Sequence, residues 1–280
     1  MLTALLGAAT AVLFGSGDFF GGLASRKSPA LAVTGVVYLV GVAAFAALLL
    51  VFRPEQVTRV DLFWGAASGI AGTVGIVSLY AALAIGRMSI VAPITAALSG
   101  AGPAVFDLAR GSHVGPITLT GLVLALVAVI IVSTTTGTVE EHGMPPLAVG
   151  LSVLAGASFA CSLVALSLTA PASGFAPLLI ARSVGAVIMG IALIVRRREM
   201  TLNRPGARMA ISAGLLDSAA NIAMISAIRV GPLAVASVVG GLYPVATMLL
   251  ARMVLGERLK LHQAFGVVLA LAAVVLTALP

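Results

Sequence analysis

Long apolar stretches separated by short polar connectors dominate the pattern of the chain. A helix needs about 20 mostly apolar residues to cross a membrane, and we count ten such stretches. We therefore predict an all-α membrane protein with ten transmembrane helices. The predicted spans are 2–24, 30–52, 61–84, 89–109, 115–134, 146–168, 174–195, 206–228, 233–254 and 261–279.

The composition supports a membrane protein over a soluble one. Hydrophobic residues make up 60% of the 280 residues and charged residues only 9%, whereas a typical soluble domain has about 25% charged residues. A single cysteine, Cys161, excludes a disulfide framework and a thiolate zinc site. We expect no enzyme activity, no cofactor, no metal and no nucleic-acid partner. The expected partners are the lipid bilayer and a small-molecule substrate, and the sequence does not identify an oligomeric partner.

The positive charges between the spans predict the orientation of the chain. The odd-numbered connectors hold eleven Lys and Arg residues and the even-numbered connectors hold four. Cytoplasmic loops of membrane proteins carry the excess of positive charge. We therefore place the odd connectors in the cytoplasm and both termini on the outer, periplasmic side of a bacterial inner membrane.

The two halves of the chain repeat each other with an offset of 145 residues. This offset brings Gly69 onto Gly214, and Gly121 onto Gly266. Each half, 1–135 and 146–280, contains five predicted spans. Because five is an odd number, the second half must enter the membrane from the opposite side. We therefore predict two inverted-topology repeats, a common plan of secondary transporters, with the substrate site near the midplane.

Two stretches resemble a known family. They are "LYAALAIGRMSIVAPITAAL" (79–98) and "SAIRVGPLAVASVVGGLYPVATMLLARMVLGERLKLHQAFGVVLALAAVV" (226–275), and the second includes the stretch 240–266. They are similar to the EamA family of the drug/metabolite transporter superfamily, and the YddG type of aromatic amino-acid exporter is the nearest relative we would name. The first half departs from the pattern, since Ser99 and Ser112 stand at the positions of Pro244 and Glu257. The resemblance implies a ten-helix carrier that exports amino acids or related metabolites.

The 240–266 stretch has an architectural interpretation. Pro244 lacks a backbone N–H and should kink the ninth span. The kink would bring Gly241 to the cavity, while Gly256 and Glu257 would turn the chain at the cytoplasmic face. We interpret these four residues as structural.

Small and polar stripes predict which spans surround the cavity. Such stripes occur where helices pack closely or face a polar path. Spans one, three, four, six, eight and nine carry them, whereas spans five and ten are rich in Leu, Ile and Val. We expect the first group to form the cavity and the second to face lipid or another subunit.

Ionisable residues inside the predicted spans are the main candidates for substrate contact. Asp217 and Asn221 share a face of the eighth span, and Asp18 lies in the first. Asp217 could bind an ammonium group, carry a proton, or pair with Arg182 as a structural ion pair. For Arg182 the structural role is favoured over contact with a carboxylate. Asp107 and Arg110 suggest a surface ion pair.

Aromatic and hydroxyl side chains complete the predicted substrate site, and they are Phe14, Tyr80, Ser99, Phe159 and Tyr243. A few polar groups among apolar walls suit a modest amphipathic solute. We therefore predict an exporter of amino acids or similar metabolites that works by alternating access. The alternatives are a multidrug efflux carrier of the same superfamily and a non-transporting membrane subunit.

Overall fold

The computed structural model of the chain is all-helical over the residues that it describes, which are 1–25, 28–85, 88–133, 145–196, 202–255 and 261–278. One short 3-10 helix, η1, covers Pro171–Ser173. The α-helices are α1 Leu2–Ser25, α2 Ala30–Val51, α3 Arg59–Ile85, α4 Met88–Ala109, α5 Pro116–Ser133, α6 Pro146–Ser167, α7 Ala176–Arg196, α8 Arg204–Val230, α9 Leu233–Gly240, α10 Tyr243–Leu255 and α11 Leu261–Ala278.

Six of these helices are long and apolar enough to cross a membrane by length and composition: α1, α2, α3, α6, α7 and α8. Four shorter apolar segments, 94–109, 116–131, 233–247 and 264–277, lie in α4, α5, α9 with α10, and α11. The prediction of a predominantly helical, apolar architecture is therefore confirmed. The count of ten spans is not established by helix length.

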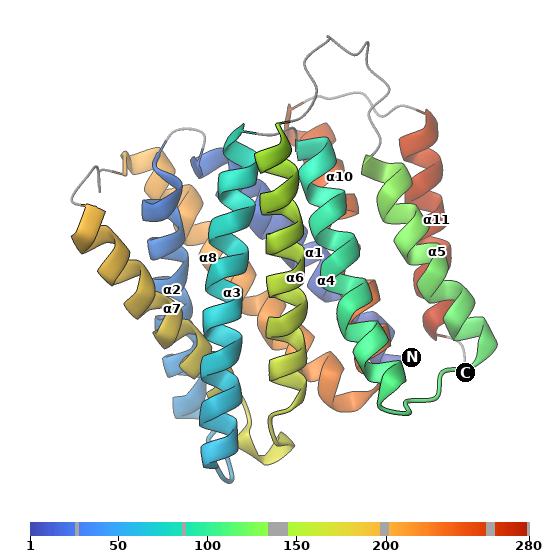
Figure 1. Cartoon of the computed structure of the whole chain (residues 1–280), viewed down its shortest axis with the longest axis horizontal. Helices are drawn as coiled ribbons and strands as arrows, with labels where there is room; N and C mark the ends of the chain where they lie inside the picture. Colours follow the sequence, from blue (N-terminus) through green and yellow to red (C-terminus); the bar gives the residue numbers. More distant parts are fainter. Residues whose placement is uncertain (26–27, 86–87, 134–144, 197–201, 256–260, 279–280) are drawn as a thin grey trace.

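The helices form one bundle with two distinct edges (Figure 1). α2 and α7 pack together at one edge, and α5 and α11 pack together at the other. Between the edges, α1 packs against α8, and α3 packs against α6. The helices that were expected to face lipid, spans five and ten, are the edge pair α5 and α11, and their outer side chains are exposed.

The ninth apolar stretch is interrupted rather than continuous. α9 ends at Gly240, α10 begins at Tyr243, and Pro244 is the second residue of α10. Proline is tolerated in the first turn of a helix because the N–H groups there have no partner within the helix. The sequence predicted a kink at Pro244, and the structure places the break just before it.

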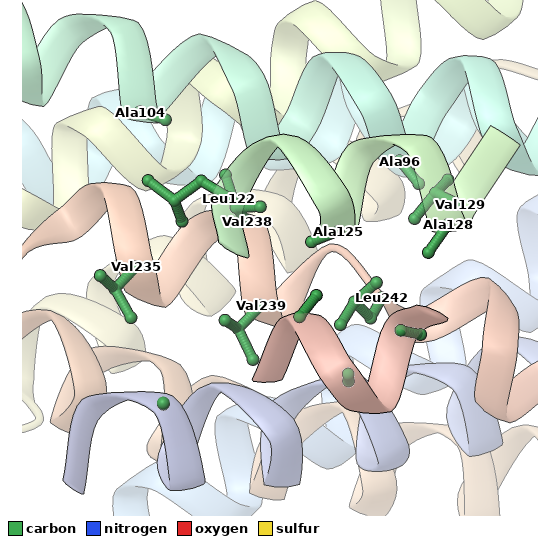
Figure 2. Close-up of a cluster of buried hydrophobic side chains, with 14 of the residues drawn as sticks. Ala96, Ala104, Leu122, Ala125, Ala128, Val129, Val235, Val238, Val239 and Leu242 are labelled. Atoms are coloured by element: carbon green, nitrogen blue, oxygen red, sulfur yellow. The ribbon is translucent and has the colours of Figure 1, made fainter. Parts of the chain in front are cut away.

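The largest buried cluster among the described residues is rich in alanine and valine and draws its side chains from α1, α4, α5, α9, α10 and α11 (Figure 2). Ala96 and Ala104 of α4 face Ala125 and Ala128 of α5 across it, and Val238 of α9 lies between. In a bilayer, helices associate through close packing, and small residues let their backbones approach. This packing fixes α9 between α4 and α5, beside the break before α10.

The connectors after α2, α4, α6 and α8 are tied together at one end of the bundle. Asp61, fully buried, accepts hydrogen bonds from the Thr58 backbone N at 2.9 Å and from Ala170 N at 2.7 Å. Asp107 accepts from Ala234 N at 2.9 Å and from the Ser112 hydroxyl at 2.8 Å. These bonds join the first half of the chain to the second.

One sequence interpretation changes here, and another lies outside the described residues. Asp107 caps the first turn of α9 instead of pairing with Arg110, whose guanidinium lies 5.5 Å from the centre of the Phe106 ring. Gly256 and Glu257, which were expected to turn the chain, lie outside the described residues.

Candidate functional site

A cavity with a volume of about 130 Å³ lies between the two halves of the chain. A water molecule needs about 10–15 Å³ of such volume, so the cavity can hold several waters or one small solute. Both halves of the chain and both sides of the α9–α10 break contribute to its wall. The lining residues come from α1, α2, α3, α4, α6, α7, α8, α9, the α9–α10 connection and the start of α10.

An ion pair stands at the wall of this cavity. Arg182 of α7 places Nη2 2.6 Å from Oδ2 of Asp217 on α8, and their side chains are only 11% and 17% exposed. One turn further along α8, the Asn221 side chain donates to the Asp217 backbone carbonyl at 2.7 Å. The sequence placed Asp217 and Asn221 on one face, and all three residues line the cavity. Of the three roles considered for Asp217, which were ammonium binding, proton transfer and an ion pair with Arg182, the structure contains the ion pair.

Asp18 of α1 adds a second carboxylate to the cavity. It lies close enough to Asp217 for the two negative charges to repel. Among the described residues Asp18 has no hydrogen-bond or ion-pair partner. Because Arg182 is engaged by Asp217, Asp18 is a cavity carboxylate without a cationic partner among the described residues.

Tyr38 of α2 is a cavity residue that the sequence analysis missed. Its ring centre lies 5.2 Å from Cζ of Arg182, and its hydroxyl lies 3.0 Å from Oγ1 of Thr73 on α3. The signal in the sequence was that Tyr38 and Thr34 are the two polar side chains in the apolar run 30–52. Ser68 and Ser162, also missed, join α3 to α6 through a hydroxyl–hydroxyl hydrogen bond of 2.8 Å at the same wall.

Four predicted aromatic and hydroxyl residues also line the cavity: Phe14, Ser99, Phe159 and Tyr243. The Tyr243 hydroxyl is buried and makes no hydrogen bond of good geometry within the described residues. Ser99 donates its hydroxyl proton to the Ala96 carbonyl at 3.1 Å.

Tyr80 does not line the cavity, although it was expected to. It is buried against Gly21 of α1, where an added Cβ would overlap the Tyr80 hydroxyl. Gly241 lies in the wall as expected, and Pro244 follows it at the start of α10. The predicted walls also omitted α2 and α7, which supply Tyr38 and Arg182.

The geometry gives the cavity two carboxylates, one guanidinium and several hydroxyls within an otherwise apolar wall. Within the described residues no cluster of three or more His, Cys, Asp or Glu side chains could hold a metal ion. A buried polar cavity between the halves of an apolar helical bundle is the place where secondary transporters of the membrane bind their solutes.

The chain belongs to the EamA-like transporter family, within the drug/metabolite transporter superfamily. The family model matches residues 1–134 and again residues 146–279. The chain is accordingly a multi-pass membrane protein of a transporter family.

One solved crystal structure, whose description is "Crystal structure of protein", is similar to this chain. The two share 17% sequence identity and superpose with a TM-score of 0.78. The match covers 99% of this chain and 96% of the other. At this identity the similarity establishes a shared fold over the whole chain. Curated protein sequences gave no match.

Proposed function

We propose that the chain is a secondary transporter of the bacterial inner membrane that exports amino acids or similar small amphipathic metabolites by alternating access. The observation that carries this proposal is the cavity itself, where the Arg182–Asp217 pair and the unpaired Asp18 face one space. A zwitterion offers an ammonium group for the carboxylates and a carboxylate for the guanidinium. The aromatic walls, Phe14 and Phe159, suit its apolar part.

Charge also limits the class of solute. The described cavity wall has one cation and two anions, so a phosphate ester or nucleotide-sugar would add negative charge to an already negative site. A solute with an ammonium group instead balances Asp18. We favour this binding role over proton transfer, so transport would follow the metabolite gradient.

The proposed architecture is ten spans in two inverted repeats, residues 1–135 and 146–280. Reciprocal packing supports it: α1 against α8 is matched by α3 against α6, and α2 against α8 by α7 against α3. If α1 to α5 correspond to α6 to α11, with α9 and α10 as one broken span, each pair is the image of the other. The odd connectors would face the cytoplasm, and the YddG type remains the proposed nearest relative.

An export assay tests the proposal. Cells that express the chain are loaded with amino acids through dipeptide feeding, and the efflux of a panel of amino acids and cationic dyes is measured. We expect amino-acid efflux that falls at least about tenfold in Asp217→Asn, because the variant loses the partner of a largely buried Arg182.

The matched control is Asp217→Glu, which keeps the charge and should retain part of the activity. Export of the dyes alone would favour the multidrug alternative. No efflux of any compound, from a chain shown to be inserted in the membrane, would favour a non-transporting subunit.

A further inference from the structure

The orientation of Arg182 is not explained by its ion pair. The contact with Asp217 joins one guanidinium nitrogen to one carboxylate oxygen, Nη2 to Oδ2. A two-point contact fixes the plane of a guanidinium, whereas a one-point contact allows it to rotate. Some other group must hold the plane if Arg182 presents a defined surface to the cavity.

The ring of Tyr38 lies where it can hold that plane. The Cζ atom of Arg182 is 5.2 Å from the ring centre, within the range in which a cation is attracted to an aromatic ring. Guanidinium groups stack on aromatic faces in addition to pairing with carboxylates. Arg182 therefore has two partners on two helices, Tyr38 on α2 and Asp217 on α8.

Tyr38 is itself held firmly. Its side chain is only 2% exposed, and its hydroxyl is hydrogen-bonded to Thr73 on α3. Thr73 Oγ1 also lies 2.7 Å from the Gly69 carbonyl, which accepts its only proton. Thr73 Oγ1 therefore lies within hydrogen-bond distance of both the Tyr38 hydroxyl and the Gly69 carbonyl, and these contacts hold the ring against α3.

Two glycines form a reciprocal slot for these side chains. On α2, an added Cβ at Gly41 would lie 3.0 Å from Cδ of Arg182. On α7, an added Cβ at Gly185 would overlap the ring of Tyr38. Each helix thus carries one large side chain and, three residues later, the glycine that admits the large side chain of the other. This arrangement is specific to the Tyr38–Arg182 contact and is not needed for the ion pair.

We propose that Tyr38 is a positioning residue that fixes Arg182 for contact with a carboxylate on the transported solute, and so sets the preference for solutes that carry one. A guanidinium has five N–H donors, and its contacts with Asp217 and Tyr38 leave donors for the cavity. Its planar fork matches a carboxylate. The inference rests on the proposed function and identifies Tyr38 as a residue that determines the specificity of the proposed site.

The test compares solutes that differ only in the carboxylate. Purified full-length carrier in lipid nanodiscs is titrated with leucine, phenylalanine and threonine, and with the amine that each gives on decarboxylation. We expect wild type to bind the amino acids more tightly than the amines. Tyr38→Leu should weaken amino-acid binding by about tenfold and amine binding by less than about twofold. Tyr38→Phe, which keeps the ring and loses the hydroxyl, should weaken amino-acid binding by about threefold.

The matched control is Phe45→Leu. Phe45 lies on the same helix, is fully buried, and belongs to a different cluster, around Leu178 and Ile225. This substitution replaces an aromatic core residue by leucine and leaves the surroundings of Arg182 unchanged. The ratio of amino-acid affinity to amine affinity should therefore equal that of wild type. If Tyr38→Leu does not fold, Tyr38→Phe and Gly41→Ala, which crowds the Arg182 stem, carry the same comparison.

The outcomes separate the inference from the proposed function. If the Tyr38 variants lower the affinities for amino acids and amines equally, or change neither, the positioning role is wrong while the carrier function stands. If wild type binds each amine as tightly as its amino acid, Arg182 does not bind the carboxylate of the solute, and the inference is likewise overturned. If wild type binds no member of any pair, both the proposed function and the inference are wrong.

Discussion

Gly15 and Gly22 lie on the same helix and belong to the same small-residue stripe, but their surroundings differ. At Gly15 an added Cβ would lie 2.7 Å from Cβ of Ala246 and would overlap the Tyr243 carbonyl oxygen. At Gly22 nothing lies within 4 Å. Of these two positions, only Gly15 requires the absence of a side chain, because α1 meets α10 there.

This difference predicts opposite effects of the same substitution. Gly15→Ala should destabilise the protein by about 1–3 kcal/mol, the usual range for overpacking, because backbone atoms of α10 must move. Gly22→Ala should be neutral or stabilise it by up to about 1 kcal/mol, since alanine favours the helix. Thermal unfolding in detergent, followed by a size-exclusion readout, measures both. Equal melting temperatures for the two variants would contradict the tight contact.

At the level of single residues, the sequence located the polar groups of the cavity but not all of their partners. Asp18, Asp217 and Asn221 stand out because a bilayer makes polar groups costly, so each one within a span signals a site. Tyr38 gave a weaker signal, because tyrosine is amphipathic and also suits an interface. Its role depends on Thr73 and Arg182, which are far away in the sequence and could not be linked to it by spacing.

At the scale of the element, α9 depends on a cap from another helix. It is eight residues long, shorter than a helix that is stable alone in water. Its residue before the first turn, Pro232, makes no side-chain cap. Asp107 of α4 accepts from Ala234 N instead, and a carboxylate at this end also interacts favourably with the helix dipole.

Asp107→Ala should therefore destabilise the protein by about 1–2 kcal/mol, the upper range for loss of a helix cap. Asp107→Asn keeps an acceptor oxygen and should lose less than half of that. The melting temperatures of the two variants and of wild type measure the effect. If the alanine variant unfolds at the wild-type temperature, the bond to Ala234 N contributes nothing to stability.

The sequence predicted most helices closely and an interruption of the ninth at Pro244, and the structure has the break just before that residue. The expected spans 2–24 and 30–52 became α1 and α2 with shifts of at most one residue at either end. The ends of such helices are well determined by the sequence, because moving a flanking charged residue from water into the membrane has a large free-energy cost. The break before Pro244 depends on packing by α1 and α4, whose contact with α9 is not encoded in local periodicity.

For the whole molecule, the orientation of the chain in the membrane can be tested at two exposed connector residues. Glu55 follows α2 and Arg204 begins α8, and both are exposed. They lie in an even and an odd connector, which the distribution of Lys and Arg assigns to opposite sides of the membrane. Cysteines at these two positions should therefore differ in access from outside the cell.

The experiment requires a background with Cys161→Ser, since Cys161 is exposed. In intact cells, Glu55→Cys should react with a membrane-impermeant maleimide, and Arg204→Cys should react only after permeabilisation. Losing Arg204 removes one of eleven positive charges and leaves the bias in place. The reverse pattern would invert the orientation, whereas labelling of both sites in intact cells would contradict the opposite placement of the two connectors.

The interruption between α9 and α10 limits how the halves can move during transport. Irregular backbone is tolerated at membrane depth only where protein covers it or where it lines water. Residues Gly240–Leu242 meet this condition now, since they are buried and Gly240 and Gly241 face the cavity. Any rearrangement that opened this segment to acyl chains would leave peptide groups without hydrogen-bond partners. If the chain works by the alternating access proposed above, its movement must therefore keep residues 240–242 covered by protein or in contact with water, whereas the exposed apolar faces of α2, α7, α5 and α11 can shift against lipid.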